Sequence, residues 1–206
     1  MRVLTTVNLK GGSGKTTTAA YLAHAFADRG RRPIVVDADP QGSAVRWQGL
    51  ADWPLPAVAL PTATLHRQLA GVVDRKRFDL VVIDTPPLED RHGIVVSALR
   101  VATDVLVTMA PTMMELDRIG PVWKAIEDAT GYRDDDPSVS VLFNRVVTNA
   151  SSTQALREVL TEQGRRVLTA TIPRREAYAQ AFGSPIGRDD PHGRVAEELL
   201  TMWGER

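Results

Sequence analysis

Short runs of apolar residues alternate along this chain with longer segments in which apolar and polar positions are mixed. Residues 78–84, Phe-Asp-Leu-Val-Val-Ile-Asp, form a strongly apolar short run. Such a run lacks the polar alternation of a half-exposed strand, so it predicts a parallel strand that is buried on both faces. Residues 15–28 carry apolar side chains on one helical face and end just before Gly30, which is typical of an amphipathic helix.

The same pattern predicts strands and helices in alternation along the whole chain. Strands are expected at residues 2–8, 33–37, 57–60, 78–84, 105–109, 139–143 and 167–172, and helices at 15–28, 41–49, 62–75, 91–102, 114–130, 151–163, 174–182 and 191–203. This alternation favours an α/β fold, an open and mostly parallel twisted sheet with helices on both faces. The length of 206 residues, with no long linker, predicts a single domain over residues 1–206.

Composition excludes several functional classes. Lys and Arg total 25 and Asp and Glu total 25, so the chain as a whole is not a strongly basic nucleic-acid binder. The absence of Cys excludes disulfides, thiolate zinc sites and iron–sulfur clusters. Because no apolar stretch has the length of a transmembrane helix or the character of a signal peptide, we expect a soluble cytoplasmic protein. Residues 194–206 carry three Glu and two Arg, the wrong composition for an anionic membrane surface, so we expect no membrane binding.

The sharpest motif lies between the first predicted strand and the first predicted helix. Residues 8–17 read Asn-Leu-Lys-Gly-Gly-Ser-Gly-Lys-Thr-Thr. The glycines let consecutive backbone N–H groups converge on phosphate oxygens, and the helix that follows points the positive end of its dipole at them. The side chain of Lys15 can reach the β- and γ-phosphates, and the Thr16 hydroxyl can ligate Mg²⁺. The motif therefore predicts a phosphate-binding loop made of Gly11, Gly12, Ser13, Gly14, Lys15, Thr16 and Thr17.

Acidic residues end two of the predicted strands. Asp84 ends the buried run 78–84, and the carboxyl end of a parallel strand borders the ligand crevice of such folds. We expect Asp84 to bind Mg²⁺ directly or through water. Asp37 ends the strand at 33–37 and Asp39 follows two residues later. Their side chains point the same way if the chain stays extended. Asp37 is interpreted as a structural acid near the loop.

A further polar residue, Asn144, follows the strand predicted at 139–143. Its side chain offers a paired donor and acceptor, which suits the edge of an adenine.

Residues 10–17, Lys-Gly-Gly-Ser-Gly-Lys-Thr-Thr, resemble the deviant Walker A motif of the ParA/MinD family of ATPases, and residues 37–42, Asp-Ala-Asp-Pro-Gln-Gly, resemble its first switch segment. The resemblance implies that Lys10 crosses a dimer interface to the phosphates of the partner's ATP. It implies that Asp39 contacts water bound to Mg²⁺ and positions the attacking water. It also implies that Asn144 binds adenine, with Pro173 and Arg174 in the turn that lines the base.

Among members of that family, the length and motif order look most like the small ParA type of plasmid partition cassettes, without an N-terminal helix-turn-helix. Relatives of this kind are ATP-dependent homodimers that bind nonspecific DNA, associate with the nucleoid, and respond to a centromere-binding partner protein. The resemblance would place DNA contacts at Arg157, Arg165, Arg166, Arg174 and Arg175. Residues 151–206 hold eight basic and eight acidic side chains, so a basic patch requires the fold to segregate them.

Two alternatives share these motifs. One is a ParA-like ATPase that positions a protein cargo, and the other is a metabolic phosphate-loop enzyme such as an ATP-dependent ligase or a small-molecule kinase. The latter would turn ATP over without DNA or a partner protein. The function favoured over both alternatives is DNA segregation, in which slow ATP hydrolysis resets a DNA-bound dimer.

Overall fold

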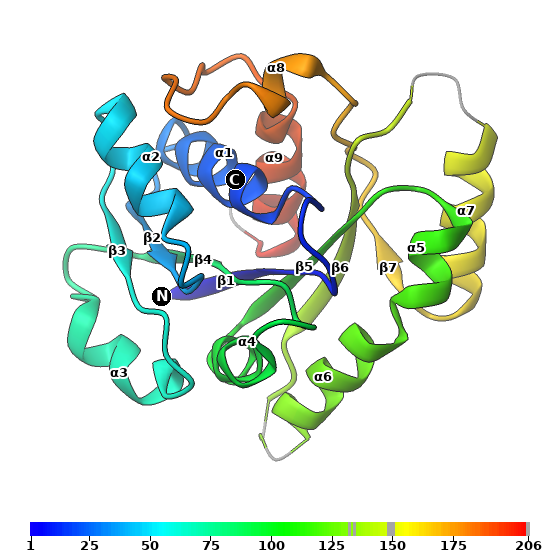
Figure 1. The fold of residues 1–206 in the computed structure, drawn as a ribbon, viewed down its shortest axis with the longest axis horizontal. Helices are drawn as coiled ribbons and strands as arrows, with labels where there is room; N and C mark the ends of the chain where they lie inside the picture. Colours follow the sequence, from blue (N-terminus) through cyan, green and yellow to red (C-terminus); the bar gives the residue numbers. More distant parts are fainter. Residues whose placement is uncertain (132, 134, 148–150, 205–206) are drawn as a thin grey trace.

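The computed structural model describes residues 1–131, 133, 135–147 and 151–204, and their centre is a seven-stranded sheet in the order β3-β2-β4-β1-β5-β6-β7 (Figure 1). Neighbouring strands pair in parallel throughout. The strands are β1 (Arg2–Val7), β2 (Pro33–Asp37), β3 (Ala57–Ala59), β4 (Leu80–Asp84), β5 (Asp104–Met109), β6 (Ser138–Phe143) and β7 (Arg166–Val167). The helices are α1 (Lys15–Ala27), α2 (Ser43–Ala51), α3 (Leu65–Val72), α4 (His92–Leu99), α5 (Met113–Arg118), α6 (Gly120–Thr130), α7 (Ser151–Glu162), α8 (Glu176–Ala179) and α9 (His192–Met202).

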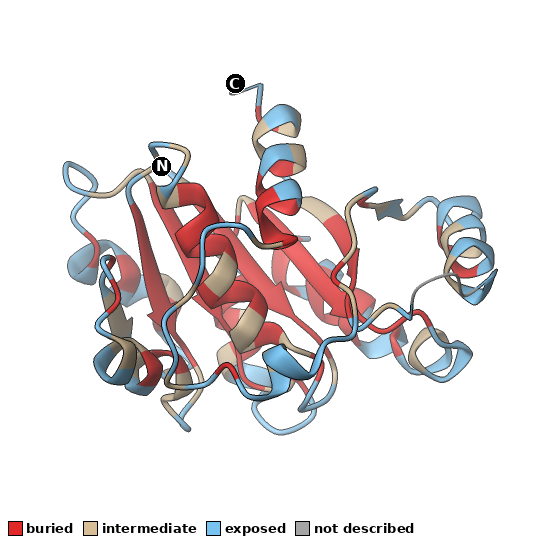
Figure 2. Ribbon diagram, turned by 90° about the horizontal axis from the view of Figure 1, so that it is seen from above, coloured by how far each residue is buried: buried red, intermediate tan, exposed pale blue. Residues whose placement is uncertain are grey.

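Helices cover both faces of the sheet, which confirms the predicted α/β class. The core on one face joins the sheet to α1, α2 and α9, and the cores on the other face join it to α3, α4, α6 and α7. Leu80 and Val82 of β4 belong to the core that contains α1, α2 and α9, whereas Val81 and Ile83 belong to a core on the opposite face of the sheet. Because successive strand side chains point to opposite faces, a strand between two helix layers is apolar throughout. Figure 2 shows the result, a buried sheet with exposed outer helix faces.

The strand register brings the functional loops together at one edge of the sheet. Asp84 at the end of β4 lies beside Thr6 of β1 on one side and Asp37 of β2 on the other. The chain leaves β1 into α1 on one face and leaves β5 toward α6 on the opposite face. Connections that diverge to opposite faces open a crevice at the carboxyl ends of the strands.

One predicted helix is divided in two. The pattern predicted a helix over 114–130, but α5 ends at Arg118 and α6 begins at Gly120. Pro121 explains the break, because proline has no N–H to donate to the carbonyl four residues earlier. Helices α3, α4 and α8 are also shorter than predicted, by a few residues at their ends.

The last strand is shorter than the predicted 167–172. Only Arg166–Val167 is a strand, although the N–H groups of Leu168 and Ile172 still donate to carbonyls of β6. The N–H groups of Thr169 and Ala170 donate instead to the carboxylate of Glu198 on α9, at 2.7 and 2.8 Å. A side chain from a distant helix thus replaces the neighbouring strand as acceptor and ends the regular pairing.

Candidate functional site

A cavity of about 1080 Å³ lies over the carboxyl ends of the central strands. Its floor is the loop at residues 11–17, and its walls come from the ends of β2, β4, β5 and β6 and from the segment that carries α8. The described residues lining it include Gly11, Gly12, Gly14, Lys15, Thr16, Thr17, Asp39, Thr85, Pro87, Thr112, Asn144, Arg145, Ile172, Pro173, Arg174, Arg175, Glu176, Tyr178 and His192.

Two glycines give the loop its shape. Gly12 and Gly14 have φ angles of +73° and +86°, which favour glycine. A Cβ on Gly14 would also collide with the side-chain amide of Asn144. Gly14 is the N-cap of α1, and no described side chain caps the first turn. The first N–H groups of α1 are therefore free to bind an anion in the cavity.

Lys15 begins α1 and lies under the loop. Its Nζ donates to the carbonyl of Lys10 at 2.9 Å and to Oγ of Ser13 at 3.4 Å. Burial lowers the pKa of Lys15, and the nearby carboxylates of Asp84 and Asp39 partly oppose this effect. The buried amino group is thus held by the loop at the edge of the cavity, and its predicted contact with phosphates stays a prediction.

Asp84 is fully buried at the end of β4. Neither of its carboxylate oxygens accepts a hydrogen bond of normal geometry from any residue that the structure describes. The pKa of Asp84 is raised to about 8, chiefly by burial and next by the charge of Asp37, while the nearby Thr16 hydroxyl and Lys15 partly oppose the rise. A buried, unpartnered carboxylate beside a hydroxyl suits a hard cation such as Mg²⁺.

Asp37 and Asp39 have different roles in the fold. Oδ2 of Asp37 accepts the N–H groups of Ala44 and Val45 at 2.9 and 3.1 Å, so this buried carboxylate caps α2. The interpretation of Asp37 as a structural acid is confirmed. Asp39 is half-buried and faces the cavity, and its Oδ1 accepts the N–H of Gln41 at 2.9 Å.

Lys10 is exposed, and it is not one of the described residues that line the cavity. Its backbone is fixed on both sides, because its N–H donates to Oδ1 of Asn8 at 3.0 Å and its carbonyl accepts Lys15 Nζ. The buried amide of Asn8 also donates to the carbonyl of Thr108 and to the carboxylate of Glu115. The loop therefore holds its main chain firmly while the Lys10 side chain extends outward.

Asn144 lies beside the loop at the end of β6. Its Nδ2 donates to the carbonyl of Ser13 and to Oγ1 of Thr18, each at 3.3 Å, and its Oδ1 accepts the N–H of Arg145. Both ends of the amide are thus engaged within the protein. These bonds accompany a left-handed backbone at Arg145, with φ +56°. The predicted adenine contact of Asn144 stays a prediction, as do those of Pro173 and Arg174, which line the same cavity.

The five arginines assigned to DNA do not share one surface role. Arg157 is half-buried, donates to the carbonyls of Val167 and Leu168 and lies over a phenylalanine ring. Arg165 lies 4.4 Å from the centroid of the Trp123 ring. Arg166 donates to a serine of β6, while Arg174 and Arg175 are exposed and line the cavity.

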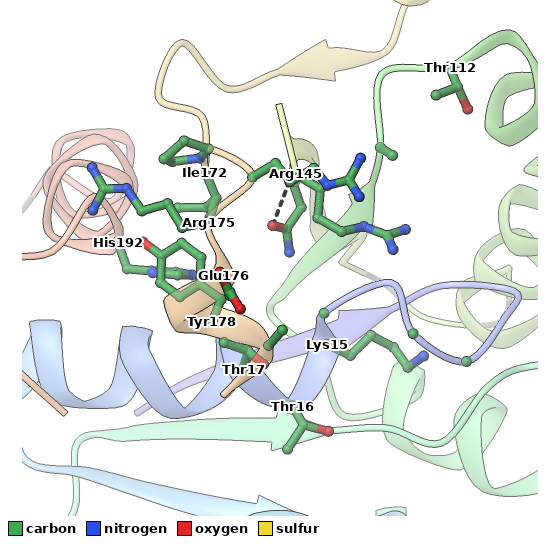
Figure 3. Close-up of a pocket in the computed structure, with 18 of the residues that line it drawn as sticks. Lys15, Thr16, Thr17, Thr112, Arg145, Ile172, Arg175, Glu176, Tyr178 and His192 are labelled. Atoms are coloured by element: carbon green, nitrogen blue, oxygen red, sulfur yellow. Dashed lines mark hydrogen bonds between the residues drawn. The ribbon is translucent and has the colours of Figure 1, made fainter. Parts of the chain in front are cut away.

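The far wall of the cavity contains residues that the sequence analysis did not assign. Figure 3 shows Tyr178, Glu176 and His192 on one side of Thr17 and Lys15 on the other. Tyr178 lies in a segment that the sequence analysis predicted only as a helix, and its apolar pattern did not place α8 at the same cavity as the phosphate loop.

The site can hold a magnesium-bound polyphosphate. Thr16, Asp84 and Asp39 offer oxygen ligands, but the described residues contain no group of three His, Cys, Asp or Glu side chains that could hold a metal without other ligands. This donor set fits Mg²⁺, which is commonly bound by one or two carboxylates together with phosphate oxygens and water. No helix in the described part of the chain is long and apolar enough to span a bilayer.

Comparisons with known proteins agree with this geometry. The family model CbiA, the CobQ/CobB/MinD/ParA nucleotide binding domain, matches residues 4–186. The chain is 35% identical to maintenance of carboxysome distribution protein A of Gloeobacter kilaueensis, over 98% of this chain and 83% of that protein. It is 28% identical to the chromosome-partitioning ATPase Soj of Thermus thermophilus, over 97% of this chain and 96% of that protein.

Solved structures share the fold at lower identity. A McdA–ATP complex from Cyanothece has a TM-score of 0.77 at 18% identity and covers 100% of this chain and 97% of its own. Cobyrinic acid a,c-diamide synthase from Mycobacterium smegmatis, with bound ADP and magnesium, has a TM-score of 0.75 at 23% identity, covering 99% of this chain and 96% of its own.

Proposed function

Because the chain belongs to the CobQ/CobB/MinD/ParA nucleotide-binding family, we propose that it is a ParA-type ATPase in which ATP and Mg²⁺ control dimerisation and DNA binding during DNA partition. In the proposed complex, the first turn of α1 and Lys15 would bind the phosphates, and Thr16 of the cavity lining together with the buried Asp84 would hold Mg²⁺. The ion neutralises phosphate charge. Asp39, which faces the cavity, orients the attacking water.

The observation that carries the proposal is the different placement of the two lysines of one loop. Lys15 is buried beneath the loop, where it can serve the nucleotide of its own protomer. Lys10 is exposed outside the cavity of its own protomer, so its side chain is free to reach the phosphates of a second one. Two protomers facing each other across their cavities would each complete the other's site.

Sedimentation of alanine variants tests this arrangement. Lys15→Ala is expected to lose ATP binding, whereas Lys10→Ala is expected to bind ATP and remain a monomer. Lys124→Ala removes another exposed lysine, which pairs with Asp128 on α6, and this variant should dimerise like the wild type. An intact ATP-dependent dimer of Lys10→Ala would reject the role of Lys10 across the interface.

DNA binding is the second part of the proposal. Arg174 and Arg175 are exposed and line the cavity, so in a dimer the pairs from two protomers would add positive charge beside the interface. Contacts with DNA phosphates make binding independent of sequence and sensitive to salt. We expect an Arg174→Ala, Arg175→Ala variant to lose ATP-dependent DNA binding. A centromere-binding partner would stimulate hydrolysis and release the protein from the nucleoid.

A protein cargo is the second candidate function. It is favoured by the 35% identity to a protein named for maintenance of carboxysome distribution. The two functions share the ATP-driven cycle and differ in the partner that stimulates hydrolysis. Affinity purification from the native host separates them, because a site-specific DNA-binding protein supports partition and a component of a protein assembly supports cargo positioning.

A metabolic phosphate-loop enzyme would behave differently from both. Its ATP turnover would be fast and would not respond to DNA. ATPase rates measured with and without DNA therefore test the whole proposal, and rapid turnover that is indifferent to DNA and to partner protein would overturn it.

A further inference from the structure

The cavity continues past the phosphate loop to a wall formed by α8 and the start of α9. Lys15 lies at one end, Thr17 lies between, and Tyr178 and His192 lie at the other end (Figure 3). In a phosphate loop the lysine meets the β- and γ-phosphates, so the chain of a bound nucleotide leads away from Lys15 toward its base. The base therefore faces the wall that contains Tyr178.

Several contacts fix the ring of Tyr178. Its hydroxyl donates to Oδ2 of Asp190 at 2.9 Å. Its ring meets Tyr21 of α1 edge-on, with centroids 5.4 Å apart, and meets His192 edge-on at 5.6 Å. These contacts hold the aromatic ring in place at the wall, and the ring remains only half-buried.

Asp190 ties α8 to the start of α9. Its Oδ1 accepts Nδ1–H of His192 at 2.6 Å and the backbone N–H of the same residue at 2.9 Å. Burial lowers the pKa of His192, and its hydrogen bond to Asp190 partly opposes this effect. Its Nε2 is buried without a hydrogen-bond partner among the residues described. The carboxylate of Asp190 is thus engaged within the wall, and the ring of Tyr178 itself carries no charge, while the exposed Glu176 lines the cavity beside it.

A neutral, fixed aromatic face beside a phosphate site suits a flat uncharged ring. We propose that the ring of Tyr178 is the surface on which the base of the bound nucleotide packs, with Asp190 and His192 as positioning residues. This inference rests on the proposed function, because it requires that the phosphates bind at Lys15.

Titration calorimetry with two ligands tests it: Mg-ATP, and Mg-tripolyphosphate, which has the phosphates but no base. Tyr178→Ala is expected to weaken ATP binding about tenfold, since base–aromatic stacking is commonly of this size. Tripolyphosphate binding should change less than about twofold. Tyr178→Phe keeps the ring and should stay within about threefold of the wild type for both ligands. Asp190→Asn should weaken ATP alone, by about threefold, because it loosens the ring.

Phe182→Ala is the matched control. Phe182 is an exposed aromatic residue of the same segment and is not among the described residues that line the cavity, so both affinities should stay at wild-type values. Thermal melting checks the fold of every variant. If Tyr178→Ala does not fold, Tyr178→Leu keeps an apolar side chain without the aromatic face and should show the same loss.

The outcomes separate this inference from the proposed function. A loss of both ligands in parallel, or of neither, in Tyr178→Ala would overturn the role of the ring. So would wild-type protein that binds ATP no more tightly than tripolyphosphate, although the phosphate loop would then stand. Wild-type protein that binds neither ligand would overturn the phosphate loop itself.

Discussion

Replacing Asp84 with Asn should make the nucleotide-free protein more stable and its Mg²⁺-dependent nucleotide binding weaker. The carboxylate is fully buried, without a hydrogen bond of normal geometry from the described residues. Asn has nearly the same shape and carries no charge. Opposite effects on stability and binding are the signature of a charge that is retained for its ligand.

The magnitude follows from the pKa of Asp84, which burial raises from 3.8 to about 8. A difference of this size corresponds to roughly 5 kcal/mol of unfavourable free energy when the group is ionised. The raised pKa already includes the attraction to Lys15, but the substitution leaves a buried amide to be satisfied, which costs about 1–3 kcal/mol. We expect a net stabilisation of about 2 kcal/mol at pH 8, which raises Tm by about 4–8 °C for a chain of this length.

The stabilisation by Asp84→Asn depends on pH, and the direction of this dependence follows from the raised pKa of Asp84. The folded protein binds the Asp84 proton more tightly than the unfolded chain, so this group lowers the free energy of unfolding as pH rises from about 4 to about 8. The Tm advantage of Asp84→Asn should therefore be largest near pH 8 and nearly vanish near pH 4.

Calorimetric melts of nucleotide-free protein between pH 5 and pH 9 provide the assay, followed by ATP titrations with Mg²⁺ and with chelator. Asp84→Asn should bind ATP at least tenfold more weakly with Mg²⁺ and no more weakly without it. Asp128→Asn, an exposed position on α6, should match the wild type throughout. An Asn variant that melts at or below the wild-type temperature at pH 8 would refute the reasoning.

Three further substitutions test other parts of the structure. Glu198→Ala leaves two backbone N–H groups without their acceptor, so we expect a loss of about 1–2 kcal/mol in chemical unfolding and faster amide exchange at residues 168–172. Asp37→Ala removes the cap of α2 and should cost about 2 kcal/mol in the same assay, whereas an unchanged midpoint would contradict the capping role. Gly14→Ala forces a side chain against Asn144 at a positive φ and should abolish ATP binding, while Gly49→Ala, in the open interior of α2, should raise Tm slightly.

The order of strands and helices could be predicted because buried parallel strands appear directly in the apolar pattern. β4 is apolar at successive positions since each of its faces has its own core. The length of β7 could not be predicted, because the acceptor for the N–H groups of Thr169 and Ala170 is Glu198, a residue of the last helix. Only the tertiary fold decides which of two acceptors those groups use.

The candidate site also contains residues whose positions could be predicted from the sequence and residues whose positions could not. The positions of Lys15 and Asp84 could be predicted because they follow from the helix start and the strand end that carry them. Tyr178 could not, since α8 reaches the cavity through contacts with Asp190 and α1 that no local pattern encodes. The surroundings of Arg157 could not be predicted either. A charged residue on an amphipathic helix suggests a surface position, but the guanidinium of Arg157 donates to two backbone carbonyls.

A single hydrogen bond connects the phosphate site to the exposed lysine of the same loop. Lys15 Nζ donates to the carbonyl of Lys10 at 2.9 Å, in a site where burial already disfavours its charge. A phosphate oxygen is a stronger partner for an ammonium than a neutral carbonyl, because it carries the opposite charge and that attraction is strong in a buried site. A polyphosphate at Lys15 therefore competes directly with the bond that restrains the main chain of Lys10. In the proposed dimer, occupancy of one protomer's cavity would in this way act on Lys10, the residue proposed to reach the second protomer, without any long-range change in the fold.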